Sequence, residues 1–413
     1  MRLSPIFILF TTLLLPISSF AGTLPQKISE DTVIEGEVTV SDDVVVEKGA
    51  ALTVKSGTKV TFENGSIDVY GTIIAEGNKG AEIHFLGAPN GKNRINGIRI
   101  INSKEKQSKI SHALFKGLNT AVQVISSSAL IEKSLFDDNK IAIDAKQKDE
   151  AEIKGNTIKN CKKVGVFLKS DSNAKVVGNK ISGIKKFGIY IHRSGGVSVS
   201  DNEITSCNIG VMVAFVGTDP AITGNEIKSN KTGISVEKGA NPKIERNTIY
   251  LNRTGISVSK RSDPEIISND IIDNKMGVFV TYSSYPTITK NNLLNNEHSV
   301  YLEFQSAQWE KEQGEKMERG GDKPGGKKMG AFGGSSKKEH VAPKKNVSSE
   351  VFAEKNFWGD DITQEMDDGN DNISAIYDFY DANLFTDAGK KYKLDKVNHM
   401  FWSRFKFENK EKN

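Results

Sequence analysis

The sequence predicts an all-β protein folded as a parallel β-helix, a solenoid of stacked coils, because three columns of residues recur every 22 residues or so. The first column opens the GISV-like runs and comprises Gly97, Ala121, Ala142, Gly165, Gly188, Gly210, Gly233, Gly255, Gly277 and Ser299. The second column comprises Asn156, Asn179, Asn202, Asn225, Asn247, Asn269 and Asn291. The third column comprises Pro220, Pro242, Pro264 and Pro286.

Each repeat contains short runs in which apolar and polar residues alternate. After Gly233, for example, Ile234 and Val236 are apolar, whereas Ser235 and Glu237 are polar. This period of two is typical of a strand with one buried face, and no repeat carries a helical stripe. A repeat has room for about three strands, too few for a propeller blade of four. Coils stacked about 4.8 Å apart would bury the inward side chains, with the asparagine column forming an amide ladder at a tight corner.

Five segments follow one another along the chain. Residues 1–21 resemble a signal peptide, with Arg2, the apolar run IFILFTTLLL and a small-x-small motif ending at Ala21. Residues 22–308 are expected to form a β-helix of about 12 coils. The Gly/Lys-rich residues 309–346 are expected to be a disordered insertion, either a tolerated excursion or an arm that binds a partner. Residues 347–385 are expected to form the last coil and a cap, and residues 386–413 a tail.

The signal peptide predicts export to the periplasm, the extracellular space or the cell surface. No later segment is apolar enough to span a membrane, and the net charge of +4 gives no indication of nucleic-acid binding. Cys161 and Cys207 share one column two coils apart, about 9.6 Å, which exceeds the roughly 7 Å limit for a disulfide. We therefore expect two free, buried thiols. The segment HMFWSRFKF, residues 399–407, is expected to cap the last coil or to contact a partner or the envelope surface.

A family resemblance rests on three stretches of sequence. These are VVVEKGAALTVKSGTKVTFENGSIDVYGTIIAEGNKGAEIHFLG with the following INGIRI, the repeated NxIxxNxxGIxV units, and NFWG followed by DDGNDNISAIYDFYDANLF. They resemble the bacterial right-handed parallel β-helix repeat proteins, with a pectate-lyase-like fold. That group includes the periplasmic maturation protein for nitrous oxide reductase and many polysaccharide-active enzymes. The resemblance runs from about Val38 to Phe385, apart from the insertion, and it implies the fold but not a single function.

Candidate catalytic residues are few. The six histidines are scattered and the cysteines form no CxxC motif, so we expect no metal site and no cofactor. Asp219 and Asp263 share one column two coils apart, near the upper end of carboxylate separations in inverting glycosidases, about 6.5–9.5 Å. Each precedes a proline, so a turn-making function is the stronger interpretation and a catalytic one the weaker.

A candidate binding face lies on the outward positions of the GIxV strands. Phe167 and Tyr190 are expected to lie side by side on adjacent coils, where their rings could stack on sugar faces. Basic residues are expected around them, namely Lys162, Lys163, Lys169, Lys185, Lys186, His192 and Arg193. Aligned lysines beside exposed rings suggest an anionic ligand with flat faces. The alternative is a solvated lysine edge next to an ordinary aromatic ladder.

These observations favour an exported, non-enzymatic protein that binds an acidic polysaccharide or a cell-envelope component. Two alternatives stay open. One is a polysaccharide lyase, hydrolase or epimerase that uses an unrecognised set of side chains, and the other is a periplasmic maturation factor for an exported metalloenzyme.

Overall fold

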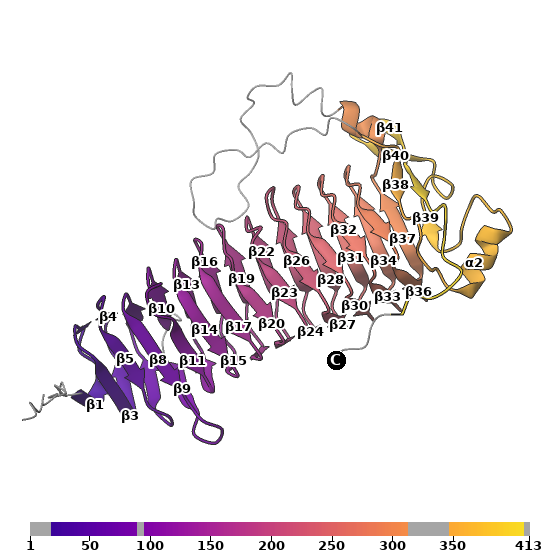
Figure 1. Cartoon of the computed structure of the whole chain (residues 1–413). Helices are drawn as coiled ribbons and strands as arrows, with labels where there is room; N and C mark the ends of the chain where they lie inside the picture. Colours follow the sequence, from indigo (N-terminus) through magenta and orange to yellow (C-terminus); the bar gives the residue numbers. More distant parts are fainter. Residues whose placement is uncertain (1–17, 89–94, 313–346, 409–413) are drawn as a thin grey trace, which may run out of the picture.

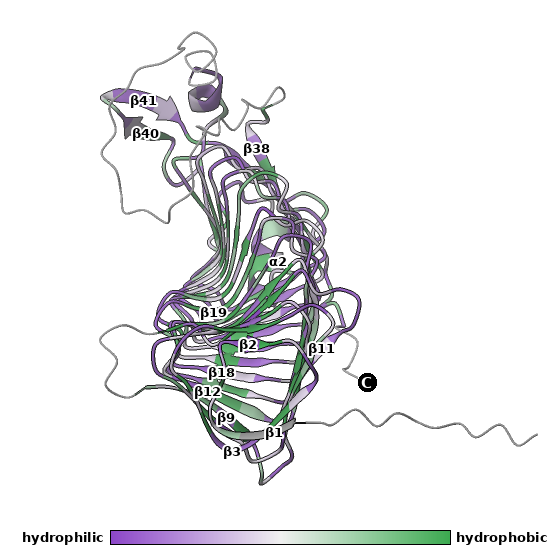
Figure 2. Ribbon diagram, turned by 90° about the vertical axis from the view of Figure 1, so that its left-hand side faces the viewer, coloured by the Kyte–Doolittle hydropathy of each residue, from purple (hydrophilic) through white to green (hydrophobic). Residues whose placement is uncertain are grey.

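The computed structural model describes residues 18–88, 95–312 and 347–408. The chain winds into an elongated solenoid that ends in a cap near the C-terminus (Figure 1). Figure 2, turned by 90°, shows the coils lying one behind another, with hydrophobic and hydrophilic residues alternating along the strands. Strands of neighbouring coils pair in parallel, one coil offset being 22 residues between Ile234 and Ile256 and 23 between Val166 and Ile189. The predicted fold class is therefore confirmed.

One face of the solenoid is a fourteen-stranded sheet with one strand per coil. Its strands are β2 (Lys27–Ile28), β4 (Val44–Val46), β7 (Ile67–Val69), β10 (Ile98–Ile101), β13 (Thr120–Ile125), β16 (Ile141–Lys146), β19 (Val164–Lys169), β22 (Phe187–His192), β25 (Ile209–Ala214), β28 (Thr232–Glu237), β31 (Thr254–Ser259), β34 (Met276–Thr281), β37 (His298–Glu303) and β39 (Ile376–Tyr377). All but the two terminal strands have three residues or more, in agreement with about 12 full coils.

The rest of each coil belongs to a 26-stranded sheet that forms two further faces. It begins with β1 (Ser18–Thr23) and β3 (Thr32–Val40). One face contains β5 (Ala51–Val54), β8 (Thr72–Glu76), β11 (Ser108–Ser111), β14 (Ser128–Glu132), β17 (Glu150–Lys154), β20 (Lys175–Val177), β23 (Ser198–Ser200), β26 (Ala221–Thr223), β29 (Lys243–Glu245), β32 (Glu265–Ile267), β35 (Thr287–Thr289), β38 (Glu350–Phe352) and β42 (Lys396–Asn398). The other contains β6 (Lys59–Phe62), β9 (Ile83–Gly87), β12 (Ala113–Lys116), β15 (Leu135–Asp137), β18 (Thr157–Lys159), β21 (Lys180–Ser182), β24 (Glu203–Thr205), β27 (Glu226–Lys228), β30 (Thr248–Tyr250), β33 (Asp270–Ile272) and β36 (Asn292–Leu294).

Inward side chains form apolar columns along the solenoid. Ile234, Ile256, Val278 and Val300 follow one another in register on four successive strands, and all four are fully buried. Each such side chain contributes roughly 1.5–3 kcal/mol of gross burial free energy. No coil can bury its own apolar face, so the stability of each depends on its neighbours.

The predicted asparagine column lies at a buried corner and is hydrogen-bonded from coil to coil. The Oδ1 atom of Asn179 accepts bonds from the backbone N–H of Asn156, at 2.9 Å, and from its Nδ2, at 3.0 Å. The same pair of bonds recurs along the column and ends at Asn356, which accepts from Asn291 at 2.8 and 3.0 Å. The asparagine of the NFWG motif thus closes the ladder.

A second ladder, which the sequence analysis missed, lies at another corner. Its asparagines are Asn230, Asn252, Asn274 and Asn296. Cys207 occupies the preceding step, donating its backbone N–H to Asn230 at 2.9 Å. Cys161 lies in the same column two coils away. Both cysteines are buried and free, as the column spacing predicts.

Two segment boundaries differ from those expected, and the cleavage boundary at 21/22 stays a prediction. Strand β1 spans the position expected for signal-peptide cleavage and pairs with β3, while residues 1–17 lie outside the described residues. The expected insertion starts too early, because residues 307–312 are helical and Trp309 donates its Nε1–H to Asp387 at 2.7 Å. Residues 313–346, to which the expectation of disorder applies, lie outside the described part. The boundary at 385/386 cuts the antiparallel hairpin of β40 (Leu384–Asp387) and β41 (Lys390–Lys393).

The C-terminal cap is held to the last coils by specific contacts. Helix α2 (Asp360–Asp367) begins after Gly359, whose φ of 93° favours glycine, and Trp358 next to it is buried. Strand β42 pairs with β38, so part of the expected tail is a strand of the sheet. Within residues 399–407, Ser403 donates its N–H to the Asn356 carbonyl at 2.8 Å. No helix among the described residues is long and apolar enough to cross a bilayer.

Candidate ligand-binding face

The two predicted aromatic residues lie on the outer side of the fourteen-stranded sheet. Phe167 of β19 and Tyr190 of β22 are in register, with ring centroids 4.9 Å apart and planes 5° from parallel. Each ring covers one face of the other, and the Lys169 Nζ lies 4.3 Å from the centroid of Phe167. Since the rings stack on each other, they offer edges and the Tyr190 hydroxyl to a ligand more readily than open faces. Burial raises the pKa of Tyr190 to about 12, so the hydroxyl stays protonated at neutral pH.

Three more rings extend this pair into a cluster. Phe187 and Phe215 are not part of the face predicted from the sequence, and His192 is predicted there only as a cation. Phe187 lies 4.9 Å from Tyr190, and His192 contacts Tyr190 edge-on at 5.8 Å. Phe215 lies 4.5 Å from His192 and has a φ of 84°, which is rare for a bulky residue. The position of Phe215 could have been found from the sequence. Phe215 directly follows strand β25 in the same way that Arg193, a predicted site residue, directly follows strand β22.

The C-terminal edge of the cluster carries two cations, of which Lys238 also forms an ion pair with Glu237 at 3.7 Å. The Arg193 guanidinium lies 5.0 Å from the Phe215 ring centroid, and the Lys238 ammonium lies 4.5 Å from it. Both cations directly follow strands of the sheet, so they and Phe215 form one column at the strand ends. The structure thus places Arg193 and His192 in the predicted face and adds Lys238.

Two of the predicted cations are neutralised by acidic neighbours. Lys162 forms an ion pair with Asp138 at 2.5 Å, and Lys169 forms one with Asp144 at 3.1 Å. The sequence predicts that both lysines are available to a ligand. The two ion pairs correct this prediction, because each lysine has an acidic partner on the preceding coil.

The remaining lysines belong to a longer column at the N-terminal edge of the sheet. In six coils the residue directly before the strand is basic, and we call these residues the basic edge column: Lys140, Lys163, Lys186, Lys231, Arg253 and Lys275. Burial and then the charges of Lys140 and Lys186 lower the pKa of Lys163, so the like charges repel one another. Lys186, Lys231 and Arg253 are exposed and have no carboxylate at ion-pair distance among the described residues. Lys185 is also exposed, beside Lys186.

A buried carboxylate lies one coil before Phe167. Asp144 is 3% exposed and precedes Phe167 in the same outward column. Its Oδ2 accepts hydrogen bonds from Gln123 Nε2 at 2.7 Å and from Lys169, while its Oδ1 is buried without a hydrogen bond. Burial lowers the pKa of the adjacent Lys146, an effect partly offset by Asp144. Along this outward column the side chains therefore change from polar, at Gln123 and Asp144, to aromatic, at Phe167 and Tyr190.

The weak catalytic candidates lie at a turn column. Asp219 Oδ1 accepts the backbone N–H of Asn241 at 3.1 Å, and Asp263 Oδ1 accepts that of Tyr285 at 2.7 Å. Asn241 in turn accepts the N–H of Asp263 at 2.8 Å. Each side chain stabilises the turn of the next coil, which accounts for these residues without catalysis.

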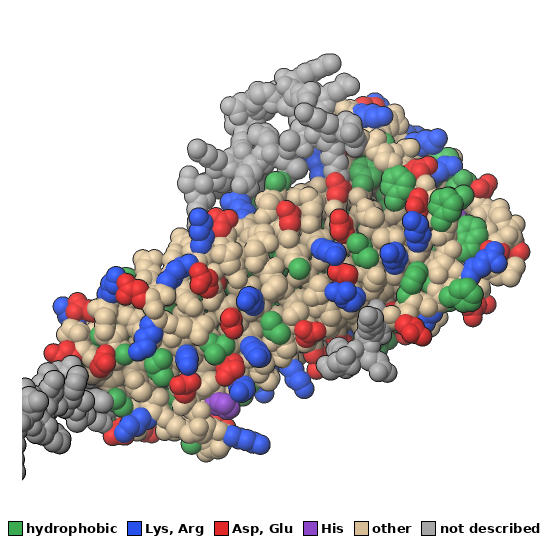
Figure 3. All heavy atoms as spheres, in the orientation of Figure 1, with side chains coloured by type: hydrophobic (Ala, Val, Ile, Leu, Met, Phe, Trp, Pro, Cys, Tyr) green, Lys and Arg blue, Asp and Glu red, His purple; other side chains and the backbone are tan. Residues whose placement is uncertain are grey.

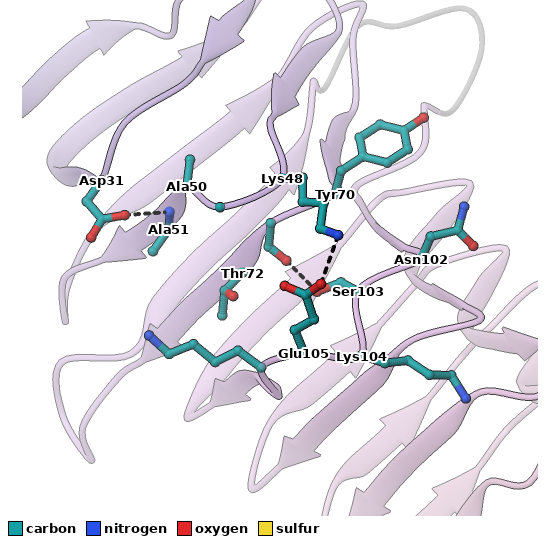
Figure 4. A pocket seen from close by; sticks show the side chains of 13 residues that line it. Asp31, Lys48, Ala50, Ala51, Tyr70, Thr72, Asn102, Ser103, Lys104 and Glu105 are labelled. Atoms are coloured by element: carbon teal, nitrogen blue, oxygen red, sulfur yellow. Dashed lines mark hydrogen bonds and ion pairs between the residues drawn. The ribbon is translucent and has the colours of Figure 1, made fainter.

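A polar cavity of about 230 Å³ lies elsewhere, among turns near the N-terminal end (Figure 4). An ion pair between Lys48 and Glu105 spans it at 2.8 Å, and Tyr70 lines it. None of the residues predicted for the binding face contributes to it. Among the described residues, no group of three His, Cys, Asp or Glu side chains is placed to hold a metal ion.

Comparison with known families agrees with this geometry. Residues 96–231 match the family described as "Right handed beta helix region", and residues 185–360 match "Periplasmic copper-binding protein (NosD)". The chain belongs to the right-handed parallel β-helix proteins. The resemblance inferred from the coil motifs is thereby confirmed for the fold of this β-helix protein. Comparison with curated protein sequences gave no match.

Solved structures similar to the β-helix protein include an alginate epimerase, a tailspike protein and a DFA-IIIase. The periplasmic alginate epimerase AlgG is 14% identical with a TM-score of 0.40, over 68% of this chain and 79% of that one. The Dettilon tailspike protein gp208 is 16% identical with a TM-score of 0.46, over 66% and 62%. The DFA-IIIase of Arthrobacter chlorophenolicus A6 is 14% identical with a TM-score of 0.44, over 66% and 81%. Likenesses this distant say nothing about the function of this chain.

Proposed function

We propose that the β-helix protein is exported and binds an acidic polysaccharide, lying lengthwise along the outer face of the fourteen-stranded sheet, without acting on it. The observation that carries this proposal is the basic edge column beside the aromatic cluster of Phe167, Phe187, Tyr190, His192 and Phe215. A polymer with one negative charge per sugar presents charges at regular intervals. The basic edge column presents cations at multiples of the coil spacing of about 4.8 Å, with a gap at Asn208.

Electrostatics favours an anionic over a neutral polymer. Burial, and then repulsion by Lys140 and Lys186, lower the pKa of Lys163, and a bound carboxylate or sulfate would relieve that repulsion. Arg193 would contribute from the opposite edge of the sheet, where Lys238 is paired with Glu237. Ring edges and the Tyr190 hydroxyl would contact the sugars between these two rows of charge.

The test compares two triple variants with the same change in net charge. Lys163→Gln/Lys186→Gln/Lys231→Gln removes three cations from the basic edge column. Lys109→Gln/Lys154→Gln/Lys175→Gln removes three exposed cations from strands of the 26-stranded sheet. Binding to alginate, polygalacturonate and heparin, with dextran as the neutral polymer, is measured by titration calorimetry at several salt concentrations.

We expect the first variant to bind the acidic polymers about tenfold more weakly, at about 0.5 kcal/mol per cation. Its binding should also depend less on salt, because the variant has fewer cations whose attraction to the polymer salt can screen. The Debye length is about 8 Å at physiological ionic strength. The second variant should bind within twofold of the parent. Equal losses in both variants, or no binding by the parent, would contradict the proposal.

A second candidate, chemistry on the bound uronate, is favoured by the buried Asp144 and its neighbour Lys169. Elimination or epimerisation needs a base to remove the proton next to the carboxylate and a cation to stabilise the resulting charge. Unsaturated products, or uptake of solvent deuterium into the polymer, would show turnover. Loss of that turnover in Asp144→Asn would place the reaction at this site.

A third candidate, assembly of an exported metalloprotein, is favoured by the match of residues 185–360 to the NosD description. Equilibrium dialysis with copper tests whether the full chain, including residues 313–346, binds the metal that this description names.

A further inference from the structure

A second aromatic cluster lies on the outer side of the fourteen-stranded sheet, close to the cap. Tyr301 of β37 is in register with Phe279 of β34 on one side and with Tyr377 of β39 on the other. The ring centroid of Tyr301 lies 5.9 Å from that of Phe279 and 4.3 Å from that of Tyr377. His298 contacts both tyrosines edge-on, at 5.3 and 5.9 Å. We call these four residues the second aromatic cluster, and the group around Tyr190 the first.

The two clusters occupy equivalent positions of the coil. Tyr190 and Tyr301 belong to one outward column and lie five coils, or about 24 Å, apart. His298 is the first residue of β37, as Phe187 is the first residue of β22. The residues of the column between Tyr190 and the second cluster are Met212, Ser235 and Ser257. A glycan that lies lengthwise on the sheet would therefore pass over both clusters.

The clusters differ in the charges beside them. The residue directly before the strand is Lys186 at the first cluster and Glu297, which pairs with Lys275 at 3.5 Å, at the second. The residue two places after the outward tyrosine is His192 at the first cluster and Glu303 at the second. Two carboxylates thus stand where the first cluster has basic groups. Along the face of the solenoid that Figure 3 shows, by contrast, acidic and basic side chains are intermixed.

Glu303 is the carboxylate of the second cluster that is available to a ligand. Its side chain is exposed, and no cation lies at ion-pair distance from it among the described residues. Two lysines of the cap, Lys393 and Lys396, lie over the ring of Phe379, at 4.7 and 5.2 Å from its centroid. A cationic group of a ligand could therefore pair with Glu303 without displacing a cation of the protein.

Negative charge is also felt at the Tyr301 hydroxyl. Burial is the main reason why the pKa of Tyr301 is raised, and the neighbouring Tyr377, Glu303 and Asp381 raise it further. The hydroxyl therefore stays protonated at neutral pH and can donate a hydrogen bond to a ligand.

Two groups of the second cluster lack a neighbour that a ligand could supply. Thr281, in register with Glu303 on the outer side of the sheet, is 5% exposed, and its Oγ1 has no hydrogen bond among the described residues. Ser257 is in register with Phe279 but is too short to cover the Phe279 ring on that side. A polar group bound at Glu303 would lie beside Thr281, and an apolar face could pack on Phe279.

We propose that the second aromatic cluster binds an amino sugar whose ammonium group pairs with Glu303. The choice of a sugar rests on the function proposed above, because both clusters lie along one face. An ammonium group offers three donors, and the Glu303 carboxylate and the Thr281 hydroxyl can each accept one. The C–H groups of the sugar can pack on Phe279, and the Tyr301 hydroxyl can donate to a sugar oxygen. The ligand of the whole face would then be a glycan that carries both acidic and amino sugars.

The experiment compares two probes that differ in the charge of one group per sugar unit. Oligomers of glucosamine and of N-acetylglucosamine, equal in length, are titrated into the full chain in a calorimeter at about pH 6, where the carboxylates are ionised. The test variant is Glu303→Gln. The matched control is Glu265→Gln, which removes an exposed carboxylate from β32 of the 26-stranded sheet. Circular dichroism verifies that each variant is folded.

The parent should bind the glucosamine oligomer at least about fivefold more tightly than the acetylated oligomer, because only the former can form the ion pair. Glu303→Gln should lower the affinity for the glucosamine oligomer about fivefold. Glu303→Lys should lower it further, since a lysine repels the ammonium group. Glu265→Gln should bind within about twofold of the parent.

The two sites can be tested separately. Lys163→Gln/Lys186→Gln/Lys231→Gln should weaken binding of alginate and leave binding of the glucosamine oligomer intact, whereas Glu303→Gln should do the reverse. Binding of the glucosamine oligomer that depends on Glu303, in a parent that ignores all acidic polymers, would support the amino-sugar site and overturn only the function proposed above.

Three results would overturn the amino-sugar site itself. The parent could bind neither oligomer or bind both equally, or Glu303→Gln and Glu265→Gln could bind alike. Alternatively, oligolysine could bind in a way that depends on Glu303 while the glucosamine oligomer does not bind, which would assign the site to a basic segment of a protein partner.

Discussion

Replacing one asparagine in the middle of the first ladder tests how much the repeated corner stabilises the solenoid. Asn225 is buried, and its Oδ1 accepts the backbone N–H of Asn202 at 3.0 Å and the Asn202 Nδ2 at 2.9 Å. Its own Nδ2 donates to the carbonyls of Val199 and Thr223 and to Asn247 Oδ1, at 3.0, 3.1 and 2.9 Å. The side chain therefore connects three consecutive coils.

Asn225→Ala leaves two buried groups without compensation. The Asn202 N–H loses the partner that the ladder gives it, and the Val199 carbonyl loses a donor. Each unsatisfied buried group costs about 1–3 kcal/mol, so we expect the two to lower the free energy of unfolding by about 2–6 kcal/mol. Asn225→Asp should cost at least as much at pH 7, because a carboxylate accepts from Asn202 but cannot donate to Val199, Thr223 or Asn247.

Urea unfolding followed by circular dichroism measures the effect, with both midpoint and slope compared, since a solenoid can unfold in parts. Asn208→Ala is the matched control, because Asn208 is exposed at a turn of the neighbouring coil and should change stability by less than about 0.5 kcal/mol. A loss below about 1 kcal/mol for Asn225→Ala, or a loss equal to that of the control, would refute this account of the ladder.

Three further predictions follow from the packing. Gly233→Ala should destabilise the protein by about 2 kcal/mol or more in the same assay, since a Cβ there would lie 2.6 Å from the Gly255 carbonyl oxygen; an unchanged midpoint would contradict this. Neither Cys161 nor Cys207 should react with iodoacetamide until the chain is denatured, because burial raises their pKa values to about 12 and about 11; a 161–207 disulfide in the mass spectrum would show that the register is wrong. Burial raises the pKa of Asp395 to about 6, so the folded state holds this proton more tightly than the unfolded chain, and its contribution to stability should fall as pH rises from about 4 to 6 and stay level above that. Asp395→Asn should remove this part of the pH dependence, and identical pH profiles for parent and variant would count against it.

The coils could be predicted in detail because each column repeats one physical requirement. Asn156 to Asn291 recur since every coil needs an amide at the same corner, and the alternation around Ile234 shows which side chains are buried. The second ladder could equally have been predicted from the sequence. Asn225 and Asn230 stand five residues apart in the repeated NxIxxN pattern, but the column is interrupted by Cys161 and Cys207, which hid its continuity.

The candidate site was harder to predict because it depends on diagonal contacts between neighbouring coils. Asp144 is in register with Phe167, yet it forms its ion pair with Lys169, two residues further along the strand and in another outward column. Phe215 was missed because the outward positions were followed only to the end of each strand. The cap has no repeat to align, so its hairpin and the pairing of β42 with β38 could not be derived from periodicity.

Because the coils from Asn225 to Asn291 pair uniformly, the length of the solenoid can be changed here in steps of one whole coil. Over this stretch every coil presents the same two amide ladders and the same three strands to its neighbour, so a unit of 22 residues could be removed or duplicated with matching joints on both sides. Each such change would move the aromatic cluster around Tyr190 relative to the C-terminal end by one coil, about 4.8 Å, and leave both ends intact. The distance between the two ends is thus a quantity that gene duplication, or an engineer, can set in fixed increments.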